Sequence, residues 1–334
     1  GQGDSSPVGW EDQIFVTSGN PETGATTLTC LSAQDGAEIW QREFQGETFS
    51  MHALNSYAST TPAVDSEHVY LTWSEGGKMN CAALTHQGDV VWQAFLGDFT
   101  EGHGFAASPV VVDGIVCLQV DLENKGFLVG IEAASGDVRW RAERPAGKAS
   151  YATPCSVAMV EGTKVVISQS MKGGMQAIDV NTGEVVWQAT DIFPARCVSS
   201  PFVANNMIIG VCGGGGSGKY LVGMDLTSTD EPQQTLKLTK QIPYVPTPVV
   251  ADNLMFLWHD RGTVSCVDLQ AEDPSKLLWT ERLGNKIAFF GSPVVAGDKV
   301  YCMSTDGRVI VIAADRDFEL LGITDLGESC LLYT

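Results

Sequence analysis

Positive charge is scarce in this chain of 334 residues. Its 20 lysines and arginines stand against 40 aspartates and glutamates, which gives a net charge of −20. A protein that binds nucleic acid needs a positive field to displace counterions from phosphates, and the sequence has no basic run. The same charge disfavours docking on an anionic membrane surface. We therefore exclude nucleic acid as a partner and expect an acidic surface.

Long apolar runs and paired cysteines are also missing. No stretch of 18 apolar residues is present, so no transmembrane segment is predicted. The nine cysteines include no Cys-x-x-Cys pair, and we interpret them as buried small hydrophobic residues. Unpaired cysteines favour a reducing compartment. No signal peptide is visible. Because the chain starts at Gly1 without methionine, we expect a processed or engineered N-terminus, and a removed export signal stays open.

Motifs for metal binding and catalysis are absent as well. The five histidines lack metal-ligand spacing, and no Gly-x-Ser-x-Gly nucleophile motif occurs, so no metal site and no catalytic residue is predicted. The glycine run from Gly213 to Lys219 resembles a phosphate loop. However, Tyr220 follows where Ser or Thr should bind magnesium, and a strand follows where a helix is needed. We predict a hairpin connection there.

What the chain does contain is a repeat. Serine or threonine precedes proline seven times, with proline spacings of 55, 47, 45, 47, 47 and 45 residues. A fixed period of this size is typical of repeat architectures. The pairs are Ser6-Pro7, Thr61-Pro62, Ser108-Pro109, Thr153-Pro154, Ser200-Pro201, Thr247-Pro248 and Ser292-Pro293.

Each repeat reads as four strands. From Ser108 to Trp140, short apolar runs alternate with turn signals such as Asp113-Gly114, and no amphipathic helix is visible in any repeat. Four antiparallel strands in about 45 residues form one propeller blade. The predicted fold is an all-β propeller, a single domain over residues 1–334. We favour seven blades over eight, the alternative in which strands of a further blade lie outside this sequence.

A tryptophan recurs in the fourth strand. The spacing Gly-x-x-x-Trp is shared by four repeats, and Trp279 holds the same place without the glycine. A buried indole covers a large apolar area, so we predict that these residues pin each blade to the next. Leu236 and Leu321 are expected to replace the tryptophan in the fifth and seventh repeats. The docking residues are Trp40, Trp92, Trp140, Trp187 and Trp279.

This unit resembles the pyrroloquinoline-quinone-type β-propeller repeat. The segment from Ala177 to Trp187 (Ala-Ile-Asp-Val-Asn-Thr-Gly-Glu-Val-Val-Trp) matches the second half of that repeat almost letter for letter. The resemblance covers essentially the whole chain. It implies one of two functions, because the family contains quinone-dependent dehydrogenases and also BamB-like scaffolds of outer-membrane protein assembly, which bind no quinone. The enzymes usually carry an adjacent Cys-Cys pair, which this sequence lacks.

The segments before each Ser/Thr-Pro pair vary strongly while their surroundings stay regular. In a propeller they rim one mouth of the central channel, and loops on a rigid scaffold commonly carry binding residues. We predict a binding face there, although each residue alone could simply plug the channel. Arg196 and Lys148 are the expected anion-binding residues. The candidates are His52, Tyr57, His103, Phe105, Lys148, Tyr151, Arg196, Tyr244 and Phe289.

The predicted function is that of a non-catalytic scaffold of the BamB-like branch, which binds a protein partner or a small ligand at this face and needs no cofactor. A carbohydrate ligand on the same aromatic rim stays open. The alternative is a quinone-dependent oxidoreductase that uses pyrroloquinoline quinone with Ca²⁺. The resemblance implies a periplasmic or secreted bacterial protein, with a cytoplasmic location left open. A monomer is favoured, but the sequence does not fix the oligomeric state.

Overall fold

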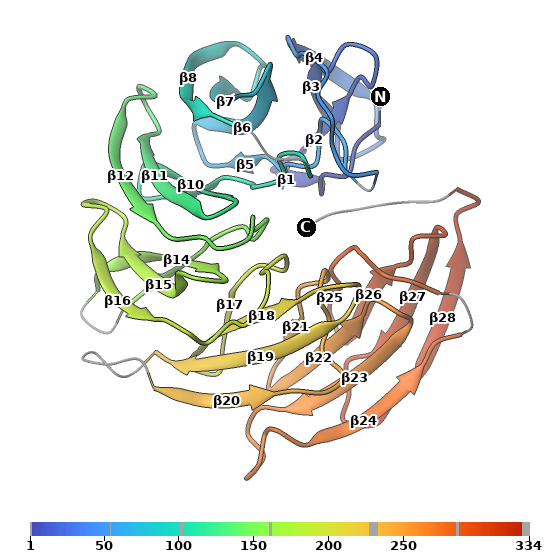
Figure 1. Cartoon of the computed structure of the whole chain (residues 1–334). Helices are drawn as coiled ribbons and strands as arrows, with labels where there is room; N and C mark the ends of the chain where they lie inside the picture. The colour runs from blue at the N-terminus through green and yellow to red at the C-terminus, as the bar shows by residue number, and fades with distance from the viewer. Residues whose placement is uncertain are drawn as a thin grey trace.

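A computed structural model describes residues 2–53, 55–99, 103–159, 162–226, 233–284 and 287–328. Within these residues the chain forms seven four-stranded antiparallel sheets and no helix. The sheets follow one another round a ring in chain order, from blue to red in Figure 1. The fold is therefore the predicted all-β propeller with seven blades.

Each blade is built from four consecutive strands. Blades 1 to 3 are β1 (Val8–Trp10), β2 (Gln13–Gly19), β3 (Thr26–Ser32) and β4 (Glu38–Phe44); β5 (Ala63–Val64), β6 (His68–Glu75), β7 (Lys78–Thr85) and β8 (Val90–Asp98); and β9 (Val110–Val112), β10 (Ile115–Leu122), β11 (Lys125–Glu132) and β12 (Val138–Arg144). Blades 4 and 5 are β13 (Cys155–Ala158), β14 (Lys164–Ser170), β15 (Gly174–Asp179) and β16 (Val185–Ala189); and β17 (Phe202–Ala204), β18 (Met207–Gly213), β19 (Gly218–Asp225) and β20 (Gln234–Leu238). Blades 6 and 7 are β21 (Val249–Ala251), β22 (Leu254–His259), β23 (Thr263–Asp268) and β24 (Leu277–Arg282); and β25 (Val294–Ala296), β26 (Lys299–Met303), β27 (Arg308–Ala313) and β28 (Leu320–Asp325).

The Ser/Thr-Pro pairs link the blades to one another. The backbone N–H of the Ser or Thr in one blade donates to the side-chain hydroxyl of the equivalent residue in the next blade. This gives the hydroxyl a role that the repeat spacing alone did not reveal, because it pairs a backbone donor just before the first strand of five blades. The bonds are Ser6 to Thr61 (3.0 Å), Thr61 to Ser108 (2.9 Å), Thr153 to Ser200 (3.1 Å), Ser200 to Thr247 (2.9 Å) and Thr247 to Ser292 (2.9 Å).

A register shift between the third and fourth strands recurs in all seven blades. Such a bulge re-aims a side chain, and the tryptophans sit beside it. Trp140 lies opposite Gly130, and its indole N–H donates to the carbonyl of Val180 in blade 4 at 2.7 Å. Trp40 and Trp92 likewise donate to carbonyls of the following blade, at His86 (2.9 Å) and Ala133 (2.8 Å).

The other two tryptophans also face the next blade, through apolar contacts. Trp187 is buried in a cluster with Ile208 and Met224 of blade 5. Trp279 makes an edge contact with Phe318, the ring centres lying 5.2 Å apart. In blade 7 the register places Gly322, not Leu321, opposite Val311 at the bulge. The prediction that Leu321 replaces the tryptophan is therefore wrong. The turn between the third and fourth strands runs from Ala313 to Glu319 here, one residue longer than the turn from Glu132 to Asp137 in blade 3, so Gly322 takes the position.

The apolar core is divided among the blade interfaces. Six clusters of buried side chains each join two consecutive blades, from blades 1 and 2 round to blades 6 and 7. No such cluster joins blade 7 to blade 1 among the described residues. In β10 every residue is buried, whereas in β2 and β26 buried residues alternate with half-buried ones. One sheet face of each terminal blade is thus only partly covered.

Candidate functional site

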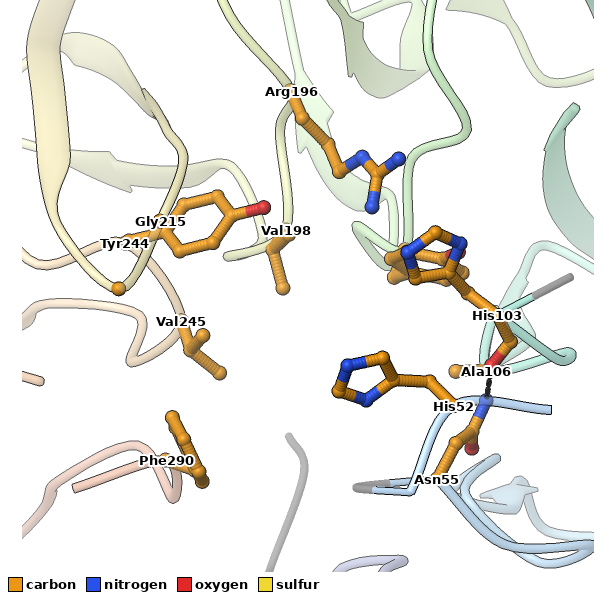
Figure 2. Close-up of a pocket in the computed structure, with 12 residues that line it drawn as sticks. His52, Asn55, His103, Ala106, Arg196, Val198, Gly215, Tyr244, Val245 and Phe290 are labelled. Atoms are coloured by element: carbon orange, nitrogen blue, oxygen red, sulfur yellow. Dashed lines mark hydrogen bonds between the residues drawn. The ribbon is translucent and has the colours of Figure 1, made fainter. Parts of the chain in front are cut away.

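The predicted rim encloses a cavity of about 320 Å³. All six connections between successive blades contribute to its wall, and the β18–β19 hairpin adds two glycines. Figure 2 shows the two imidazoles on one side and Val245 with Phe290 on the opposite side. The lining residues are His52, Asn55, His103, Ala106, Tyr151, Arg196, Val198, Gly215, Gly216, Tyr244, Val245 and Phe290.

The two histidines form one flat wall of the cavity. The rings of His52 and His103 are stacked, with centres 5.6 Å apart and planes 8° from parallel. Asn55 holds their two connections together, because its side-chain amide donates to the carbonyl of His103 at 2.6 Å and its backbone N–H donates to the carbonyl of His52 at 2.9 Å (Figure 2). These hydrogen bonds lie in the connections from blade 1 to blade 2 and from blade 2 to blade 3, and they place the imidazole pair.

Arg196 supplies the positive charge of the cavity. Its guanidinium carbon lies 5.8 Å from the ring centre of Tyr151 and one of its nitrogens lies 3.6 Å from a carboxylate oxygen of Glu123. Tyr244 lines the same cavity. Burial raises the pKa of the Tyr244 hydroxyl, while the charge of Arg196 and a hydrogen bond from it act in the opposite direction. The cavity therefore combines one cation with two tyrosines and two imidazoles, groups suited to aromatic or anionic ligands.

Buried polar groups fix the loops that carry these residues. Asp260 is almost fully buried and accepts the backbone N–H groups of Tyr244 (2.7 Å) and Val245 (3.1 Å). Burial raises the pKa of this carboxyl, and the two backbone hydrogen bonds oppose the rise. On the neighbouring hairpin, the guanidinium of Arg261 donates to the carbonyls of Gly215 (3.1 Å) and Gly216 (3.2 Å).

A buried ion pair supports the segment that carries Lys148 and Tyr151. Arg144 and Asp121 meet through two hydrogen bonds of 2.6 and 3.0 Å, and both side chains are essentially inaccessible to solvent. The backbone of Asp121 forms an isolated β-bridge with the backbone of Ser150. The Ser150 hydroxyl in turn donates to the carbonyl of Cys197 at 2.7 Å. Burial raises the pKa of Asp121, and the charge of Arg144 counteracts it. The network joins blade 3 to the two connections that follow.

A second cavity, of about 280 Å³, adjoins the first and shares Arg196, Gly215 and Tyr244 with it. Lys148 and Lys219 also line it, so three cations meet there. Its remaining wall is formed by residues from three loops, namely Met171, Pro194, Ala195, Gly213 and Gly214.

The structure brings most of the predicted site residues together. His52, His103, Tyr151, Arg196 and Tyr244 line the main cavity, and Lys148 is exposed beside the second one.

Three predicted residues lie elsewhere. Phe289 is fully buried against Trp258, and the next residue, Phe290, lines the cavity instead. Tyr57 donates its hydroxyl to the carbonyl of Phe49. Phe105 is 7% exposed and packs in the core between blades 2 and 3.

The sequence prediction missed several lining residues, among them Asn55, Val198, Val245 and Phe290, which lie in segments already chosen for the rim. The glycine hairpin had a clearer signal. Connections between second and third strands lie at the same end of a blade as the segments before each first strand, because neighbouring strands are antiparallel. Gly215 and Gly216 could therefore have been placed at the rim from the strand order.

Groupings that would hold a metal ion are not found among the described histidines, cysteines, aspartates and glutamates. Nor does any described residue belong to a helix of the length and apolarity needed to cross a membrane.

Comparison with known proteins decides the family. The family model described as outer membrane protein assembly factor BamB matches residues 2–99 and 25–276, most of the chain. The chain belongs to the BamB family. The structure of BamB from Moraxella catarrhalis superposes with a TM-score of 0.69 at 14% identity, covering 98% of this chain and 86% of that one. At that identity the superposition shows a shared fold.

This BamB family member is also similar to enzymes. A quinohemoprotein alcohol dehydrogenase, ADHIIG, from Pseudomonas putida HK5 has a TM-score of 0.63 at 13% identity, covering 92% of this chain and 62% of its own. In sequence, quinohemoprotein alcohol dehydrogenase ADH IIB of Pseudomonas putida is 26% identical over 131 residues. That match spans 37% of this chain and only 18% of the dehydrogenase.

The site residues fit a quinone with calcium only in part. A flat aromatic tricarboxylate could lie against the imidazole wall with a carboxylate on Arg196, since guanidinium groups pair well with carboxylates. Calcium requires several carboxylate or carbonyl oxygens at one point. Among the described residues the acidic side chains form no such cluster, so the carboxylates that calcium prefers are not gathered at one point there.

Proposed function

We propose that the protein is a non-catalytic binding scaffold that holds a segment of a partner protein, or a small ligand, in the cavity on this face. The observation that carries the proposal is the convergence of all six inter-blade connections on one cavity of about 320 Å³. Concave sites with apolar walls and a few polar groups are typical of ligand pockets, and tyrosine and arginine are frequent hot-spot residues of protein interfaces.

Family membership supports the scaffold over an enzyme, because the matching family is described as an assembly factor. By the same likeness we propose that the protein acts as a monomer in the periplasm or outside the bacterial cell. The cysteines are consistent with either a reducing or an oxidising compartment, since the eight described thiols are free and all but Cys155 are buried.

Peptide selection tests this proposal. A display library of random peptides is panned on the wild-type protein, and the affinities of enriched peptides are measured by fluorescence polarisation. The double variant Y151A/R196A removes the ring and the charge that meet in the cavity, and we expect binding to fall about tenfold or more. The control is R139A, an exposed arginine near the opposite ends of the strands. The protein-partner form of the proposal fails if no peptide is enriched, and the assignment of the site to this cavity fails if enriched peptides bind Y151A/R196A as tightly as wild type.

The second candidate is the quinone-dependent oxidoreductase, which the sequence match to a quinohemoprotein alcohol dehydrogenase favours. A thermal-shift titration with pyrroloquinoline quinone, with and without calcium, distinguishes the two, because a ligand that binds the native state raises the melting temperature. A saturable rise that depends on calcium would favour the enzyme. We expect no calcium-dependent rise, because the described residues contain no cluster of acidic side chains for the ion.

A further inference from the structure

The cavity beside the main site is basic, in a chain with twice as many acidic as basic residues. Lys148 precedes β13, Arg196 precedes β17 and Lys219 lies in β19, so three separate segments bring their cations to one hollow. Arg196 has a carboxylate of Glu123 at 3.6 Å. Among the described residues, no carboxylate lies within ion-pair distance of Lys148 or Lys219.

Three like charges around one cavity repel one another unless a counter-charge lies between them. The electrostatic balance therefore favours an anion from solution. A cleft lined by charges of one sign also concentrates the electric field. The positive field is needed here, because the acidic surface outside the cavity repels anions. Lysine and arginine together are the side chains that proteins use for carboxylate and phosphate groups.

The glycine hairpin leaves space for such a group. Gly213 and Gly214 line the cavity, and a Cβ added at Gly214 would have no neighbour within 4 Å. An oxyanion can therefore approach the backbone of this turn closely, as in other concave loops that bind anions. The hairpin leads into β19, a strand, so it lacks the helix N-terminus on which nucleotide phosphates rest in phosphate loops.

We infer that the cavity between Lys148, Arg196 and Lys219 binds an oxyanion group, a carboxylate or phosphate, of the ligand whose remaining part fills the main cavity. The link between the two parts rests on the proposed function, and on the fact that both cavities share Arg196, Gly215 and Tyr244. The group could belong to a small polyanion or to the acidic side chains of a peptide, and the chemistry of recognition is the same.

The test measures anion binding directly. Citrate and inorganic pyrophosphate are titrated by calorimetry into wild type, K148Q/K219Q and K78Q/K125Q. The last variant removes the same charge from two exposed lysines in second-to-third-strand hairpins of the same face, outside both cavities. We expect K148Q/K219Q to bind both anions about tenfold or more weakly than wild type, and K78Q/K125Q to bind as wild type does. Neither variant alters the residues of the imidazole wall.

Two results would overturn the inference: no binding of either anion to wild type, or equal losses of affinity in the two double variants.

The peptides enriched in the selection above give a second experiment, which identifies the source of the anionic group. Enrichment of Asp and Glu, together with weaker binding to K148Q/K219Q, would assign the group to a peptide. Anion binding with no enriched peptide would assign it to a small polyanion, and only the protein-partner form of the proposed function would fail. Peptides that depend on Tyr151 while the protein binds neither anion would leave the proposed function standing and refute the anion site.

Discussion

The backbone N–H of Thr247 donates to the hydroxyl of Ser292 at 2.9 Å, while the hydroxyl of Thr247 accepts the N–H of Ser200 at the same distance. Each Ser/Thr thus belongs to two blades, and the proline that follows fixes the start of the first strand where no donor is needed. Five contacts of this kind join successive blades among the described residues, which gives a physical reason for the recurrence of the pair in the sequence.

Replacing Thr247 tests the contact. T247V keeps the shape of the side chain but leaves the Ser200 N–H without its acceptor, so we expect a loss of about 1 kcal/mol in the free energy of unfolding. T247S keeps the hydroxyl and should lose less. Urea denaturation followed by tryptophan fluorescence measures both. A loss of stability in T247S with none in T247V would mean that the methyl group, not the hydrogen bond, matters at this position.

The glycine of the Gly-x-x-x-Trp motif can be tested with an internal control. Gly183 and Gly36 have nearly the same left-handed backbone, with φ of 74° and 73°. A Cβ at Gly183 would lie 2.7 Å from the ring of Trp140, whereas at Gly36 it would meet nothing within 4 Å. Both alanine variants incur the backbone cost, and we expect G183A to lose about 1–3 kcal/mol more than G36A because of overpacking. Similar losses would contradict a tight fit of the indole against this turn.

The pair of Arg144 and Asp121 should be costly to break from one side. D121A leaves a buried guanidinium without its carboxylate, and we expect a loss of about 3–5 kcal/mol in unfolding free energy. The double variant D121A/R144M removes both charges and should be more stable than D121A. A double variant less stable than D121A would show that Arg144 stabilises the fold mainly through Ser168 and Gln176, the other acceptors of its guanidinium.

Asp260 should position the cavity wall without touching a ligand. D260A removes the acceptor of the Tyr244 and Val245 N–H groups, so the loop loses its anchor. We expect enriched peptides to bind D260A several-fold more weakly, while D260N, which keeps one acceptor oxygen, retains most of the affinity. The measurement is fluorescence polarisation at a temperature where circular dichroism shows both variants folded. Equal affinity of D260A and wild type would exclude a positioning role.

The buried thiols should be unreactive in the native state. Burial raises the pKa values of Cys81, Cys117 and Cys266 to about 12, from an ordinary value of 9.0. Because the thiolate is the reactive form, iodoacetamide at pH 8 should leave these three residues unmodified, and peptide mass spectrometry should find them labelled only after denaturation. The raised values also mean that any stability that depends on the neutral thiols is lost only as the pH rises from about 9 towards 12. Rapid native labelling would indicate that the blades open readily.

The fold was predictable because its signals are local and repeated. Ser/Thr-Pro marks the start of each blade and Gly-x-x-x-Trp marks the fourth strand of four of them, so the strand order followed from spacing alone. The site was predictable only as a set of segments. The choice between Phe289 and Phe290 depends on the path of an irregular connection, where no strand alternation tells which side chain faces the channel. Gly322 was missed because the turn from Ala313 to Glu319 is one residue longer than the equivalent turn in blade 3, and the length of this turn sets which residue lies at the bulge.

Among the described residues, blades 1 and 7 each have one sheet face that is only partly covered. Each interior blade is stabilised by two neighbours, but among the described residues the two terminal blades share no apolar cluster with each other. In such an array the free energy of local opening is lowest at the ends. Amide hydrogens of β2 and β26 should therefore exchange before those of β10 and β14. Blades 3 and 4 should be the last to open, because the buried Arg144 of blade 3 pairs with Asp121 in its own blade and also donates to Ser168 of blade 4.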